Sequence, residues 1–290
     1  MNLGFIGLGI MGQPMSRRLL QAGFNLIVYT RTPARAQAVM AMGAQWAESP
    51  ADVAARSEII ITMLPDTPEV ETVLFGENGV YQGLSAGKIV VDMSTISPEA
   101  TVKFAEQLRA RECELLDAPV SGGESGAIAG TLTIMVGGNE NSFQKCLPVF
   151  QAMGKNIVHL GTNGDGQRAK LVNQVICALN ILAMSEGLHL AERLGLDREK
   201  VLQVVSAGAA ASWMLSNLAP RILHNDFRPG FKIKLQQKDL RLAMELIQAL
   251  GENFPGTALA YSLFNKAVEQ GLGEQGTQGL INLFKKQSRV

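Results

Sequence analysis

The sequence predicts an α/β protein in which a doubly wound parallel sheet is followed by an all-helical part. Two observations support this prediction. As far as Thr162, short β-rich runs alternate with amphipathic segments, which is typical of a parallel sheet covered by helices. Beyond Thr162 the strand signals vanish and only helical patterns remain. We therefore expect a sheet domain over residues 1–162 and a helical domain over residues 163–290, joined by a long helix.

The expected strands of the first domain are runs of apolar and β-branched residues. Their near-continuous apolar character fits strands that are buried on both faces of a sheet. They are Leu3–Ile6, Leu26–Tyr29, Ile59–Met63, Ile89–Met93, Glu114–Asp117, Thr131–Val136 and Asn156–His159. Between them, the segments Ala34–Met42 and Pro98–Arg109 have helical periodicity.

The expected helices of the second domain begin with an unusually long one that is apolar on most sides. Such a helix is typical of one shared by two domains or buried in a dimer, so a homodimer or homotetramer is expected. Gly195 and Gly251 are placed to end helices, and Asp197 is placed to cap one. The helices are Gln167–Leu194, Asp197–Ala207, Trp213–His224, Leu235–Leu250, Pro255–Glu269 and Thr277–Lys286.

Composition narrows the classes of protein to consider. Lys plus Arg and Asp plus Glu are balanced at 26 each, so no global field recruits nucleic acid or an anionic membrane. The longest apolar stretch, Leu171–Leu190, is interrupted by polar residues, whereas a membrane span is more uniformly apolar. Cysteines and histidines lack metal-ligand spacing, so no metal is expected. No export signal is visible, so a cytoplasmic protein is expected.

The motif G-x-G-x-x-G directly follows the first expected strand, where a dinucleotide-binding turn belongs. Its first glycine permits the tight turn, the second lets the backbone approach a pyrophosphate, and the third lets helix and strand pack closely. The helix that follows offers unpaired N–H groups to phosphate. These residues predict a Rossmann-type unit whose cofactor contacts are Gly7, Leu8, Gly9, Ile10, Met11 and Gly12.

The end of the second expected strand favours NADP(H) over NAD(H), although use of NAD(H) stays open. An acidic residue there binds the ribose 2′-hydroxyl of NAD, whereas an arginine accommodates a 2′-phosphate. No acid is present, and Arg31, Thr32 and Arg35 follow the strand. The alternative is that Arg31 is only a solvated side chain.

Two further strand ends lie where the ligand crevice of a parallel sheet forms. One carries Met63, Leu64 and Pro65, and the other carries Thr95 and Ser97. Ser97 precedes a proline and suits a helix N-cap, so Thr95 is the better cofactor contact.

Two later motifs carry polar chemistry. Asp117–Gly123 ends a strand with Ser121, Gly122 and Gly123, which could wrap a carboxylate or form a structural turn. Lys170 lies early in the long apolar helix, with Asn173 and Gln174 three and four residues later. A lysine there suits proton transfer if it faces a cleft, and is otherwise a solvated residue near a helix start.

Four motifs in order, Gly7–Gly12, Asp92–Pro98, Asp117–Gly123 and Gly164–Gln174, closely resemble the β-hydroxyacid dehydrogenase family across essentially the whole chain. That family includes 3-hydroxyisobutyrate dehydrogenases, tartronate semialdehyde reductases and glyoxylate/succinic semialdehyde reductases. The resemblance implies an active site between the two domains. It implies that Ser121, Gly122 and Gly123 hold the substrate carboxylate, that Lys170 is the general acid, and that the amides of Asn173 and Gln174 orient the substrate. Many members carry Asn where this chain has Gln174, and tartronate semialdehyde reductases also carry Gln.

Other segments extend the resemblance. It implies that Phe231 and Lys238 contact the cofactor and that Trp213 lies near the substrate, although Trp213 could equally be a core aromatic. The sequence around Lys238, Gln236–Asp239, is most similar to that of the glyoxylate/succinic semialdehyde reductases, which favour NADPH. We therefore expect NADPH-dependent reduction of small aldehyde acids to hydroxy acids.

The alternatives are NAD-dependent 3-hydroxyisobutyrate oxidation and tartronate semialdehyde reduction. Two more are an imine reductase, against which Lys170 argues, and a non-catalytic dinucleotide-binding module.

Overall fold

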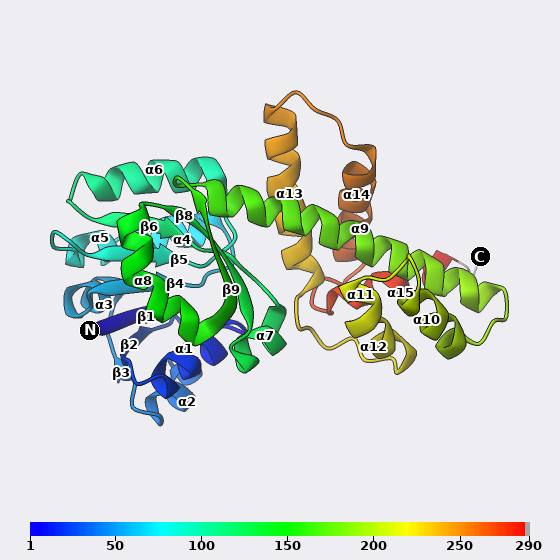
Figure 1. Cartoon of the computed structure of the whole chain (residues 1–290), viewed down its shortest axis with the longest axis horizontal. Coiled ribbons are helices and arrows are strands. Elements are labelled where there is room, and N and C mark those ends of the chain that lie inside the picture. The colour runs from blue at the N-terminus through cyan, green and yellow to red at the C-terminus, as the bar shows by residue number, and fades with distance from the viewer. Residues whose placement is uncertain (288–290) are drawn as a thin grey trace. The chain divides into compact units, whose positions relative to one another are not determined.

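The computed structural model describes residues 1–287 and divides the chain into two compact units, Met1–Lys170 and Leu171–Val290. The division falls inside helix α9 (Asp165–Arg193), a short way beyond the 162/163 boundary suggested by composition. The first unit contains the sheet, and the second is helical in its described part. α9 therefore contributes its first turns to the sheet unit and the rest to the helical unit (Figure 1).

The described residues of the first unit form one nine-stranded sheet in the order β3-β2-β1-β4-β5-β6-β8-β7, with β9 paired to β8. From β3 to β6 every pairing is parallel, as the alternation of strands and helices predicts. Beyond β6 the sheet is mixed, because β8 pairs antiparallel to both β6 and β7 and parallel to β9. The strands are β1 Asn2–Ile6, β2 Asn25–Tyr29, β3 Gln45–Trp46, β4 Ile59–Thr62, β5 Ile89–Asp92, β6 Glu114–Asp117, β7 Val120–Ser121, β8 Leu132–Gly138 and β9 Gly154–Gly161.

The central strands β1, β2, β4, β5 and β6 are buried on both faces, which explains their near-continuous apolar character. Strand β9 is mostly exposed or half-buried. Successive side chains alternate between two hydrophobic clusters, so Phe5 and Ile61 join one cluster while Ile6 and Ile60 join the other. The first cluster packs under α1 (Gly12–Gln21), α2 (Gln37–Met40), α7 (Gly123–Ala129) and α8 (Glu140–Met153). The second packs under α3 (Pro50–Arg56), α4 (Thr67–Phe75), α5 (Val80–Gly83) and α6 (Pro98–Arg109).

Helix ends in the second unit follow local sequence signals. Gly195 and Gly251 have φ of +70° and +71°, the left-handed conformation that ends helices, and Asp197 caps the next helix. The single helix expected over Trp213–His224 is wrong: two short helices stand there, because Pro220 has no N–H to continue the ladder. The helices after α9 are α10 Arg198–Ala207, α11 Trp213–Asn217, α12 Ala219–Leu223, α13 Ile233–Ala249, α14 Pro255–Glu269, η2 Thr277–Leu280 and α15 Ile281–Gln287.

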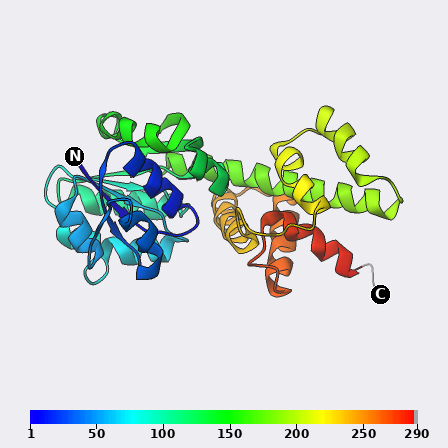
Figure 2. The same ribbon diagram turned by 90° about the horizontal axis from the view of Figure 1, so that it is seen from below.

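The core of the helical unit gathers around Phe264, Leu240 and Ile281, all fully buried. α13 and α14 lie side by side and antiparallel (Figures 1 and 2). Among the described helices, only α9 is long and apolar enough to cross a membrane by length and composition, so its polar interruptions do not by themselves exclude a span. Within the most apolar 18-residue stretch of α9, 44% is buried inside the chain. Core helices of soluble proteins can be equally long and apolar.

Candidate active site

The glycine-rich turn after β1 has the shape that dinucleotide binding requires. Each of its three glycines meets a different steric or conformational requirement. Gly7 has φ of +104°, and a Cβ there would stand 2.4 Å from the Met63 carbonyl oxygen. A Cβ at Gly12, the first residue of α1, would stand 1.9 Å from the Gly7 carbonyl oxygen. Nothing lies within 4 Å of a Cβ added at Gly9, so the backbone there is open to a ligand phosphate. The turn therefore fits a dinucleotide.

The end of β2 presents positive charge without an acid. Arg31, Thr32 and Arg35 are exposed, and neither arginine forms an ion pair with any side chain in the described part of the chain. The first acidic residue of the whole sequence is Glu48. No carboxylate from this segment therefore competes with a phosphate for these guanidinium groups.

The loops after β4 and β5 are tied to each other through Ser94, which is fully buried. Its hydroxyl accepts a hydrogen bond from the Leu64 N–H at 2.8 Å. Met63 and Leu64 are half-buried and Pro65 is exposed, and Thr95 is half-buried beside Ser94. Ser97 caps α6 by accepting from the Ala100 N–H at 3.2 Å, as predicted.

The folded sheet brings Lys170 to the Ser121–Gly123 motif. Lys170 is only 6% exposed, and its Nζ donates to the Val120 carbonyl oxygen at 2.8 Å, one residue before Ser121. Ser121 ends β7, and Gly122 and Gly123 follow with φ of +130° and +61°. The lysine is therefore not a solvated residue at a helix start.

Asp117, at the end of β6, is fully buried and accepts backbone hydrogen bonds from Gly164 and Gln167, both at 2.9 Å. The pKa of this carboxyl is raised to about 6, mainly by burial and in smaller part by the nearby charge of Asp92, against the lowering effect of the backbone N–H groups. Asp117 thus binds the start of the helix that carries Lys170.

In the helical unit, Gln174 belongs to a buried polar network. Its Nε2 donates to Asp239 Oδ2 at 2.5 Å and to Gln236 Oε1 at 3.2 Å. Lys238 pairs with Asp239 Oδ1 at 2.7 Å, and Asn173 donates to Gln174 Oε1 at 2.9 Å. Three of the predicted residues, Asn173, Gln174 and Lys238, therefore meet in one cluster. Asp239 connects Gln174 with Lys238, a role that its place in the sequence does not reveal.

The remaining predicted residues of this unit lie outside that network. Trp213 is 54% exposed at the start of α11, so the alternative of a core aromatic is wrong. Phe231 is half-buried just before α13, and its carbonyl accepts from the Thr277 N–H at 3.0 Å.

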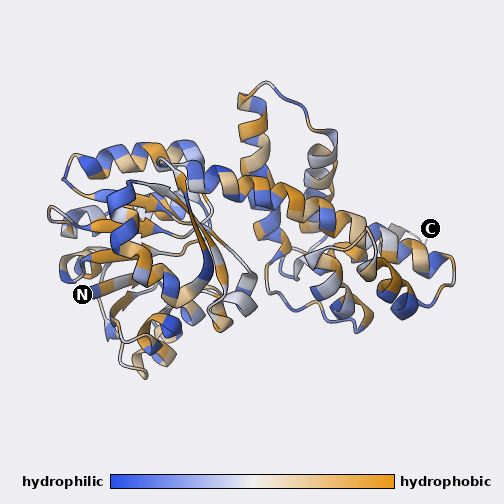
Figure 3. Cartoon of the chain, in the orientation of Figure 1, coloured by the Kyte–Doolittle hydropathy of each residue, from blue (hydrophilic) through white to orange (hydrophobic). Residues whose placement is uncertain are grey.

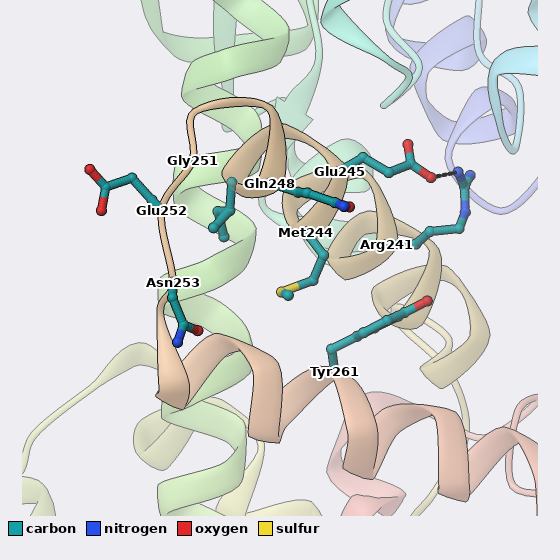
Figure 4. Close-up of a pocket in the computed structure, with 9 residues that line it drawn as sticks. Arg241, Met244, Glu245, Gln248, Gly251, Glu252, Asn253 and Tyr261 are labelled. Carbon is teal, nitrogen blue, oxygen red and sulfur yellow. Dashed lines mark hydrogen bonds and ion pairs between the residues drawn. The ribbon is translucent and has the colours of Figure 1, made fainter.

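A pocket of about 650 Å³ lies along α13 and α14 (Figure 4). It holds none of the predicted site residues, and its lining is Arg241, Met244, Glu245, Ile247, Gln248, Gly251, Glu252, Asn253 and Tyr261. Over the described residues, no group of three or more His, Cys, Asp or Glu side chains is arranged to hold a metal.

The carboxyl ends of β1, β4, β5 and β6 thus carry the glycine turn, two loops and Asp117 on one edge of the sheet. Doubly wound sheets bind dinucleotides at such an edge, so the fold and the glycine turn place the chain among dinucleotide-binding proteins. Residues 2–161 match the model of the NAD-binding domain of 6-phosphogluconate dehydrogenase. Residues 164–284 match the NAD-binding region of NADP-dependent 3-hydroxyisobutyrate dehydrogenase.

Known proteins are similar to this chain over nearly its full length. A 2-hydroxy-3-oxopropionate reductase of Escherichia coli is 49% identical, with 98% of this chain and 97% of the relative covered. A 2-(hydroxymethyl)glutarate dehydrogenase of Eubacterium barkeri is 39% identical, covering 100% and 96%. A solved Mycobacterium tuberculosis 3-hydroxyisobutyrate dehydrogenase with L-serine has a TM-score of 0.88 at 31% identity, covering 100% and 99%. The chain belongs to the β-hydroxyacid dehydrogenase family of NAD(P)-dependent oxidoreductases, which act on CH–OH groups of small hydroxy acids.

Proposed function

We propose that the enzyme reduces small aldehyde acids to hydroxy acids with NADPH and that Lys170 is the general acid. The observation that carries this proposal is the buried Lys170 Nζ, held at 2.8 Å from the Val120 carbonyl oxygen beside Ser121. A buried lysine of this kind can hold and release a proton close to a substrate. The adjoining Ser121 and glycines are free of bulky side chains and suit a carboxylate.

The chemistry divides between the cofactor and the chain. A bound nicotinamide supplies the hydride that reaches the carbonyl carbon of the aldehyde. The ammonium of Lys170 gives a proton to the carbonyl oxygen as the C–H bond forms, and it takes one back in the reverse direction. Ser121, Gly122 and Gly123 hold the substrate carboxylate. Ser121–Gly123 and Lys170 belong to the same compact unit, Met1–Lys170. A carboxylate held by the first group therefore fixes the distance between the reacting carbonyl of the substrate and Lys170 Nζ.

The preference for NADPH rests on Arg31, Thr32 and Arg35. Their exposure after β2, together with the lack of an acid before Glu48, supports recognition of a 2′-phosphate. The family model of the second half is also that of an NADP-dependent enzyme. The cofactor contacts of Phe231 and Lys238, and the substrate contacts of Asn173, Gln174 and Trp213, stay predictions from the resemblance.

The substrate panel that tests the proposal has two parts. Glyoxylate and succinic semialdehyde are the substrates that the sequence favours. A second candidate is 2-hydroxy-3-oxopropionate, also called tartronate semialdehyde, which the relative at 49% identity favours. Initial rates with each aldehyde acid, measured with NADPH and NADH, should show turnover on at least one of the three and a higher kcat/KM with NADPH. No turnover on any aldehyde acid contradicts the proposed reaction.

We also propose that the enzyme is a homo-oligomer whose copies meet along α9. Val172, Ile176 and Leu190 are each more than half exposed, and their spacing places them on one face of the helix. Figure 3 shows that α9 is hydrophobic along much of its length. Light scattering should find a dimer or tetramer for the wild type and a smaller species for Ile176→Glu. Val204→Glu, at an exposed apolar position on α10, is the matched control.

A further inference from the structure

We propose that Asp117 and Gln167 are positioning residues that clamp the first turn of α9 and thereby set the place of Lys170 Nζ. The inference rests on the proposed function, because it assigns these residues an effect only through the lysine. Neither side chain reaches the solvent, since both are fully buried. They come from segments fifty residues apart and meet at the start of the helix.

Asp117 supplies the first half of the clamp. One carboxylate oxygen accepts from the Gly164 N–H and the other from the Gln167 N–H, so it satisfies two of the unpaired donors at the helix start. The backbone packs closely on this side, at two glycines that leave no room for a side chain. A Cβ at Gly137 would stand 2.7 Å from Asp117 Oδ1, and one at Gly166 would stand 2.5 Å from the Met135 carbonyl oxygen.

Gln167 supplies the second half. Its amide group bridges the loop after β5: Nε2 donates to the Ser94 carbonyl oxygen at 2.9 Å, and Oε1 accepts from the Ile96 N–H at 3.1 Å. Ser94 in turn holds the Leu64 N–H. One side chain therefore connects the lysine helix with both loops on the cofactor edge of the sheet.

Lys170 lies three residues after Gln167, one helical turn further along the same helix. Its Nζ reaches Val120, which follows Asp117 by three residues. Asp117 at the end of β6 binds the start of α9, and the Val120 carbonyl that accepts from Lys170 lies three residues further along the chain. A shift of about 1 Å in a reacting group can cost about 100-fold in rate, so a loosened clamp should appear in kcat.

A double-mutant cycle between Asp117→Asn and Lys170→Ala tests the clamp. Asp117→Asn should lower kcat roughly 10- to 100-fold. In the Lys170→Ala background, where residual turnover is measured over long incubations, it should lower the rate by less than about twofold, because the group it positions is gone. NADPH titration by fluorescence should show nearly the same dissociation constant for Asp117→Asn and the wild type.

The outcomes separate the two claims. If Lys170→Ala lowers kcat by a factor of about 100 or more and Asp117→Asn lowers the residual rate by the same factor as it lowers the wild-type rate, the clamp is overturned and the proposed function stands. If Lys170→Ala keeps full activity, both are overturned. Gln167→Met, which keeps the length of the side chain but removes both hydrogen bonds, repeats the cycle in case Asp117→Asn does not fold.

Asn139→Ala is the matched control for loss of a helix cap. The side chain of Asn139 caps α8 by accepting from the Ser142 N–H at 3.1 Å, a hydrogen bond within the first turn of α8. This variant should lose stability like the clamp variants and keep the kcat of the wild type. An equal loss of kcat in Asn139→Ala would overturn the clamp, because it would show that kcat follows stability alone.

Discussion

The buried carboxyl of Asp117 predicts a pH dependence of stability that a single substitution removes. Its pKa rises from 3.8 to about 6 on folding, mainly through burial. Because the folded-state pKa is raised, this group stabilises the fold fully below pH 3.8, and that stability is lost as the pH rises through 6. The shift of about two units corresponds to about 3 kcal/mol in total.

Asp117→Asn removes the titration while keeping the shape of the side chain. Between pH 5 and pH 7.5, linkage predicts that the wild type loses about 1.4 kcal/mol of unfolding free energy relative to the variant. All other titrating groups are shared, so the difference between the two proteins isolates Asp117. Asp92, whose charge raises this pKa, is present in both proteins.

Urea unfolding of both proteins at the two pH values measures this difference. The chain has two tryptophans, Trp46 in β3 and Trp213 in α11, so Trp213→Phe in both proteins leaves Trp46 to report on the unit that holds Asp117. A difference that stays constant with pH, or that grows in favour of the wild type as the pH rises, refutes the assignment of a raised pKa.

Three further predictions concern other parts of the chain. Arg31→Asp should lower the NADPH-over-NADH ratio of kcat/KM by about tenfold or more, because a carboxylate repels the 2′-phosphate, and an unchanged ratio contradicts the role of Arg31. Phe264→Ala should lower the unfolding free energy by about 3–5 kcal/mol, since it empties the fully buried centre of the helical core, and urea denaturation measures this. Gly12→Val should abolish NADPH binding in a fluorescence titration, because a Cβ there stands 1.9 Å from the Gly7 carbonyl oxygen; retained binding would show that the turn is not the site.

Much of the fold could be predicted because its signals are local. The glycine turn, the strands β1, β4, β5 and β6, and the helices over Pro98–Arg109 and Pro255–Glu269 follow from runs and caps within a few residues of each other. Strands β3 and β7 have two residues each and are too short to show any periodicity. The break in the helix expected over Trp213–His224 was signalled by Pro220, and that signal was missed.

The sequence indicates which residues belong to the candidate site, but it does not show which of them contact each other. Lys170 and Ser121 stand out in the sequence, but the hydrogen bond from Lys170 to Val120 spans fifty residues and depends on the sheet. Asp117 and Gln167 were missed as individual residues for the same reason: only the folded chain shows that the carboxylate binds the start of α9. An acidic residue at the end of a strand whose preceding residues are apolar is the signal that could have identified Asp117.

The central claim is that Lys170 supplies the proton for reduction of an aldehyde acid. Its most direct test is the single-turnover rate of NADPH oxidation by the best aldehyde acid, compared between the wild type and Lys170→Ala, with NADPH binding measured on the same samples. If Lys170 is the proton donor, the variant binds NADPH like the wild type and reacts slower by a factor of about 100 to 10,000. An equal single-turnover rate in the two proteins would contradict it.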